Sequence, residues 1–135
     1  MKDIDKIKTF EDVCEIVGID ANKFNQHCLE QYLEEDEIAY KKLKLIISVI
    51  NEGWKPDWED KNEYKYYPYF NMAGSFSFVV TNYHYEYSVA DVSSRLCFKT
   101  KNDAIYTANH FLDLYRIFYT YEIPKRNTLF EKFKK

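Results

Sequence analysis

The sequence predicts an α+β fold: N-terminal helical segments, then a three-stranded antiparallel sheet, then a C-terminal helix. Two observations lead to this prediction. Apolar residues recur at helical spacing along residues 34–50 and again along residues 101–119, whereas strand-favouring aromatic residues fill much of residues 66–99. We expect the central and C-terminal helices to pack together on one face of the sheet.

The first 53 residues contain the helix signals. Thr9 and Asp12 have the spacing of a capping box, and Gly18 is the expected end of a short first helix. Residues 19–33 predict a partly helical segment without clear boundaries. The acids at residues 34–37 stand where a helix N-terminus favours negative charge. The central helix that follows has one apolar face, formed by Ala39, Leu43, Ile46, Ile47 and Ile50.

Residues 51–58 predict a joint between the helical half and the sheet. Gly53 can adopt the left-handed conformation that closes a helix, and Trp54 is expected to fold back onto the last helical turn near Val49. Pro56 prevents the helix from continuing. We therefore expect a connecting loop between this point and the first strand.

The three expected strands are residues 66–71, 76–87 and 92–99. Pro68 predicts that the first is an edge strand or that a strand starts there. In the second, the aromatic positions change from even to odd numbers, which predicts either a bulge or turn near Asn82 or a second half that faces the other way. The side chains expected to face the helices are Phe70, Phe76, Phe78, Val80, Leu96 and Phe98.

The opposite sheet face is the candidate binding surface. Strand alternation places Tyr67, Tyr69, Ser77, Val79, Arg95 and Cys97 there, and the candidate binding residues are Tyr67, Tyr69, Tyr83, Tyr85 and Arg95. Tyrosines beside an arginine can stack on bases, sugars or a partner's side chains. The alternative is that another helix or a second subunit covers this face.

Composition and charge restrict the class of protein. The chain of 135 residues suits one domain over residues 1–121, followed by a basic tail over residues 122–135. Residues 93–135 hold 9 Lys and Arg against 4 Asp and Glu, so a basic surface is confined to the last third. We expect a reduced, cytoplasmic protein, because the three cysteines have no paired spacing and the sequence shows no secretory signal. It has no long apolar run, so we do not expect it to enter a membrane.

No set of residues has the spacing that a particular chemistry requires, so we expect no catalytic residues, metal or cofactor. Two enzymatic alternatives remain open. Cys97 and His84 could form a nucleophile pair from neighbouring strands. The acids of the loop could hold a divalent cation, although a solvated acidic loop is the favoured interpretation. These acids are Asp57, Glu59, Asp60 and Glu63.

Four strings carry a resemblance to a known family: NEGWKPDW at residues 51–58, YYPYFN at 66–71, SRLCFK at 94–99 and FLDLY at 111–115. Together they resemble a family of small uncharacterised proteins found in gut-bacterial genomes, prophages and related phages. The resemblance covers roughly residues 9–120. It implies no catalytic residue, because that family has no assigned activity.

These observations predict a non-enzymatic binding or interaction protein, acting inside the host cell as an accessory product of a phage or mobile element. A virion structural component and a small hydrolase or nuclease are the alternatives. We expect a protein partner or self-association, with a small ligand or single-stranded nucleic acid as further options.

Overall fold

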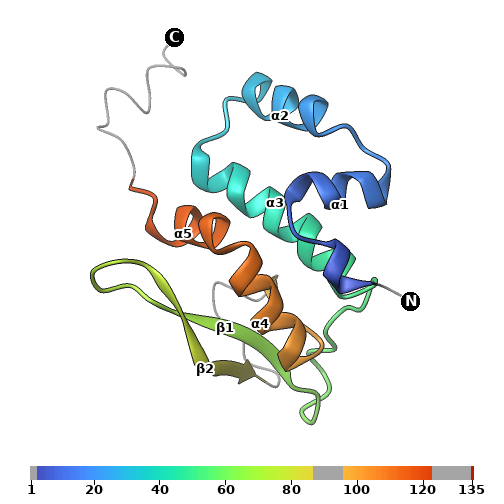
Figure 1. The fold of residues 1–135 in the computed structure, drawn as a ribbon, viewed down its shortest axis with the longest axis vertical. Helices are drawn as coiled ribbons and strands as arrows, with labels where there is room; N and C mark the ends of the chain where they lie inside the picture. Colours follow the sequence, from blue (N-terminus) through green and yellow to red (C-terminus); the bar gives the residue numbers. More distant parts are fainter. Residues whose placement is uncertain (1–2, 87–95, 123–134) are drawn as a thin grey trace.

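The computed structural model describes residues 3–86, 96–122 and 135, and for residues 80–86 it describes the backbone alone. Within these residues a helical half packs beside a two-stranded antiparallel sheet (Figure 1). This agrees with the α+β prediction. None of the helices in the described ranges has the length and apolar character that a membrane span requires.

The N-terminal helices begin and end largely where the local signals predict. A 3-10 turn, η1 (Ile4–Lys6), leads into α1 (Phe10–Val17), whose capping box forms between Thr9 and Asp12. The helix ends at Gly18, which has a φ of 77°. The segment of uncertain boundaries contains α2 (Ala21–Glu30), which is capped by the Asp20 side chain.

The long central helix α3 (Glu35–Ile50) buries the predicted apolar face. Its buried residues are Ala39, Leu43, Ile46, Ile47 and Ile50. Asn51 caps its C-terminus, and both Glu52 and Gly53 then adopt positive φ values, 52° and 81°. The helix therefore ends at the predicted joint, although two residues share the left-handed turn.

In the part of the chain that the structure describes, the sheet has two strands, β1 (Lys65–Asn71) and β2 (Ser77–Glu86), and not the three that were predicted. The predicted third strand contributes one antiparallel bridge, in which Phe98 and Tyr66 exchange backbone hydrogen bonds of 2.9 and 3.1 Å. On the side of this segment away from β1, the Cys97 carbonyl and the Lys99 N–H bond to the Asn51 side chain. Residues 92–95 of the predicted strand lie outside the described residues.

The predicted irregularity of the second strand is confirmed. Pro68 pairs with Tyr83 and Phe70 pairs with Phe78, so residues 79–82 of β2 lie opposite Tyr69 alone. An insertion of this kind bends a strand and changes which residues face the core. It accounts for the change of aromatic phase along β2.

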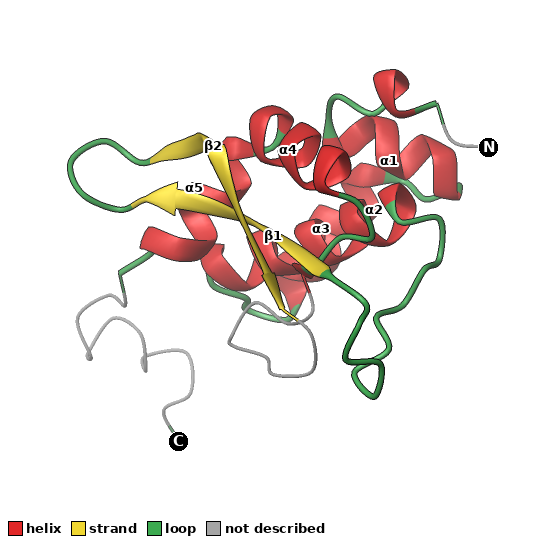
Figure 2. Cartoon of the chain, turned by 90° about the horizontal axis from the view of Figure 1, so that it is seen from below, coloured by secondary structure: helices red, strands yellow, loops and turns green. Residues whose placement is uncertain are grey.

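The predicted C-terminal helix is in fact two helices, α4 (Lys101–His110) and α5 (Leu112–Thr120). The break is at Phe111, whose φ of −124° and ψ of 30° are not helical. α4 packs on both strands, whereas α5 packs mainly on α3 (Figures 1 and 2). The bend lets one segment reach both layers and buries Phe111 between them.

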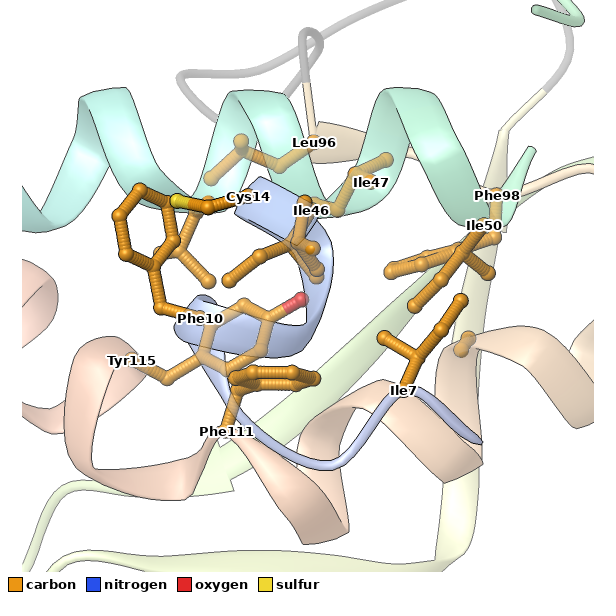
Figure 3. Close-up of a cluster of buried hydrophobic side chains, with 13 residues drawn as sticks. Ile7, Phe10, Cys14, Ile46, Ile47, Ile50, Leu96, Phe98, Phe111 and Tyr115 are labelled. Atoms are coloured by element: carbon orange, nitrogen blue, oxygen red, sulfur yellow. The ribbon is translucent and has the colours of Figure 1, made fainter. Parts of the chain in front are cut away.

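The core lies between α1, α3 and the segment from residue 96 to α5. Figure 3 shows Ile46, Ile47 and Ile50 of α3 facing Leu96, Phe98 and Tyr115. Aromatic rings of the hairpin extend this core, since Phe70 lies 4.7 Å from Tyr115 and 4.9 Å from Phe76 between ring centroids. The predictions that Phe70, Phe76, Phe78, Leu96 and Phe98 face the helices are confirmed.

Candidate functional site

The predicted tyrosine surface is only partly present. Tyr69 is exposed, at 45% of its full area, but Tyr67 is buried, at 4%, so the expectation that Tyr67 faces outward is wrong. Tyr83 and Tyr85 lie on β2, opposite Pro68 and Tyr66, but their side chains are outside the described residues. Arg95 also lies outside them.

Alternation also fails at Cys97, which was expected on the open face and is buried together with both of its neighbours in sequence. The reason is that the loop between α3 and β1 lies over this side. Cys97 shares a groove with Trp54 and Trp58 of that loop. The alternative expectation was cover by another helix or a second subunit, whereas the residues next to Cys97 belong to a loop of the same chain.

The loop is organised around Lys65, the first residue of β1, whose side chain is completely buried. Its Nζ atom donates to the backbone carbonyls of Asp57 at 2.7 Å and Asp60 at 3.0 Å. It also lies 3.5 Å from Oε1 of Glu63 and 5.3 Å from the ring centre of Trp58. A buried ammonium needs such partners, because its hydration is lost.

The acidic residues of the loop complete this arrangement. The carboxylates of Asp57 and Asp60 accept from the backbone N–H groups of Glu59 and Asn62, which closes two tight turns. Oε1 of Glu63 accepts from the backbone N–H of Asp57 at 2.8 Å. Three of the four acids that sequence reasoning considered for a cation site thus hold the loop around the Lys65 ammonium.

The groove formed by this loop and the end of α3 is the candidate functional site. It has a volume of about 590 Å3, within the range of roughly 300–1,000 Å3 found for ligand sites. Trp54, Pro56 and Trp58 supply its aromatic and apolar loop side. The remaining lining residues are Lys44, Ile47, Ser48, Asn51, Lys55 and Cys97.

Asn51 ties the two sides of the groove together. Its Nδ2 donates to the carbonyl of Cys97 at 3.0 Å, and its Oδ1 accepts from the N–H of Lys99 at 3.3 Å. One side chain thus serves both a donor and an acceptor of an extended segment, as a neighbouring strand would. This contact holds α3 and the segment before α4 in a fixed relation.

The environment of Cys97 weighs against thiol catalysis in the groove. Burial raises the pKa of the Cys97 thiol to about 11 from its ordinary value of 9.0. The thiol is therefore protonated at neutral pH, whereas a nucleophilic cysteine needs a lowered pKa. The His84 side chain, its predicted partner, lies outside the described residues.

Sequence reasoning treated residues 51–58 as a joint and did not predict the groove. A signal was present, because both tryptophans of the chain flank Pro56 within a polar segment. Tryptophan is large, and on an exposed loop it often marks a contact surface. Which helix and strand would complete that surface depended on the tertiary structure.

Within the described ranges, no group of three or more His, Cys, Asp or Glu side chains is arranged to hold a metal ion. Comparisons with models of protein families, with curated proteins and with solved structures found no match to this chain.

Proposed function

We propose that this protein is a non-enzymatic docking module that binds a segment of a protein partner in the Trp54–Trp58 groove. The observation that carries the proposal is the presence of both tryptophans, half-buried and next to Pro56, in a groove whose loop is held by the buried Lys65. Tryptophans dominate the binding energy of many protein interfaces. A loop fixed before binding loses little entropy when a partner docks.

Charge favours a protein segment over a nucleic acid strand. Residues 51–65 contain five acidic residues against three lysines, one of which is the buried Lys65. A polyanion would be repelled by the acids of this loop. Lys44 and Lys55 line the groove itself, so the segment that fits carries an apolar or aromatic side chain beside an acidic one.

The setting that we propose is an accessory protein of a phage or mobile element acting inside a host cell. Its support is the resemblance of residues 51–58 and three further strings to proteins of such genomes. A virion component is the second structural option, and recovery of the protein only in assembled particles would favour it. The raised pKa of the Cys97 thiol disfavours a small hydrolase that uses this cysteine as its nucleophile.

The groove can be tested by its own fluorescence, because Trp54 and Trp58 are the two tryptophans of the chain. A partner captured from lysate of the producing cells is purified and titrated against the wild-type protein. We expect the tryptophan emission to shift when the partner binds. Trp54→Ala removes one interface anchor and Lys55→Glu removes one charge pair, so each should weaken binding by at least about tenfold.

Tyr69→Ala is the matched control, because Tyr69 is an exposed aromatic residue on the sheet outside the groove. It should bind the partner as the wild type does. Binding that is lost in Tyr69→Ala but kept in Trp54→Ala would move the site to the tyrosine surface. Circular dichroism of each variant shows whether the fold is retained.

A further inference from the structure

A second groove, of about 620 Å3, lies on the helical half of the molecule, where η1 passes the C-terminal ends of α1 and α3. Figure 1 shows the N-terminal end of the described chain beside the end of α3. The apolar part of the lining comes from Ile7, Ile16 and Val49. Ile16 is 54% exposed, so the groove presents one apolar side chain to the solvent.

The rim of this groove is acidic. Asp3, Asp12, Glu15 and Glu52 line it together with a single lysine, Lys6. Two backbone N–H groups, each 2.9 Å from its Oδ2, lower the pKa of the Asp12 carboxyl, which therefore stays ionised. Lys6 lies 3.9 Å from Asp3 in an exposed pair, which offsets one of these charges.

The ends of the two helices add to this negative potential. The C-terminus of a helix has a partial negative charge, and natural helices often place a basic residue there. Neither α1 nor α3 has a basic residue in its last turn. Glu15 instead stands in the last turn of α1, and Glu52 follows α3.

We propose that this groove is a second docking surface, which accepts a cationic amphipathic segment of a protein partner. Lysine or arginine side chains of the segment pair with the acidic rim and the helix ends, and a neighbouring leucine or phenylalanine covers Ile16. Charge complementarity selects this occupant, since the rim has four acidic residues against one lysine. This groove shares no lining residue with the Trp54–Trp58 groove.

The probe is a fluorescein-labelled peptide of roughly ten residues in which lysines flank a leucine and a phenylalanine, the pattern of an amphipathic docking segment. Its binding to the full chain is measured by fluorescence anisotropy at low and high salt. We expect Glu15→Lys and Ile16→Asp each to weaken binding at least about tenfold, and a peptide with glutamate in place of lysine not to bind.

Two matched controls lie on α2 outside the groove. Leu29→Asp places a charge at another aliphatic residue that is 67% exposed, and Glu30→Lys reverses another exposed acid. Both should bind the peptide as the wild type does. If Glu30→Lys weakens binding as much as Glu15→Lys, and Ile16→Asp has no effect, the attraction is general and the proposal is overturned.

The chain without peptide provides the second arm of the experiment. Its oligomeric state is measured by analytical ultracentrifugation for the wild type and for Ile16→Asp. A monomer in both cases agrees with an external partner. A dimer that Ile16→Asp dissociates would show that a second copy occupies the groove, and would overturn the proposal of a cationic partner.

Discussion

Replacing Lys65 by methionine tests how the groove is held, because methionine keeps most of the apolar stem and removes the ammonium. After this change the carbonyls of Asp57 and Asp60 have lost their hydrogen-bond donor, and the Glu63 carboxylate has lost its counter-charge. Breaking a buried ion pair from one side costs about 3–5 kcal/mol, and one charged hydrogen bond contributes about 1.5–3 kcal/mol. Asp57 and Asp60 are exposed residues, so water can replace part of the lost bonding.

We therefore expect Lys65→Met to lower the free energy of unfolding by about 2–4 kcal/mol. Urea unfolding should be followed by circular dichroism for the helices and by tryptophan emission for the loop. The midpoint should fall by roughly 1–2 M. The tryptophan emission of the folded variant should also differ from that of the wild type, since Trp58 loses the cation near its ring. During unfolding in urea, the tryptophan emission should change before the circular dichroism signal of the helices.

Lys61→Met is the control, because Lys61 is an exposed lysine in the same loop. Its effect should stay within about 0.5 kcal/mol. Lys65→Arg keeps the charge but replaces a compact ammonium by a planar fork, so it should restore only part of the stability. A Lys65→Met protein as stable as Lys61→Met, with unchanged emission, would refute the view that Lys65 organises the loop.

Three further predictions concern the packing around the groove and the end of α5. Asn51→Ala should lower the free energy of unfolding by about 2–3 kcal/mol, measured in urea, because it leaves a carbonyl and an N–H of the adjoining segment without partners. Cys97 should resist alkylation at pH 8 in the folded protein and react after unfolding, as mapped by mass spectrometry, because burial raises its pKa to about 11. Early alkylation would contradict this burial. The hydrogen bond from Tyr121 to Glu34, 2.7 Å long, raises the pKa of Tyr121 to about 12 from 10.0. The stability difference between the wild type and Tyr121→Phe should therefore be constant below pH 10 and disappear as the pH rises through about 12.

Much of the helical half could be predicted from the sequence because its determinants are local. The capping box of Thr9 and Asp12 and the left-handed Gly18 each involve residues within one or two helical turns of one another. The apolar spacing of α3 likewise identifies its buried face without reference to the rest of the chain. The inward-facing Phe70 and Phe98 followed from strand alternation alone.

The sheet and the groove were decided by contacts between distant segments. Within the described residues, the predicted third strand forms one bridge to β1 at Phe98, and its other side is held by the Asn51 side chain, 46 and 48 residues away along the chain. Alternation placed Tyr67 and Cys97 on an open face, but both are buried, and Cys97 shares a groove with residues of the loop between α3 and β1. In the sequence, Lys65 has no feature that distinguishes it from an exposed lysine at the start of a strand. It becomes a buried centre only because the loop turns its carbonyls inward, which is a property of the folded chain and of no local pattern.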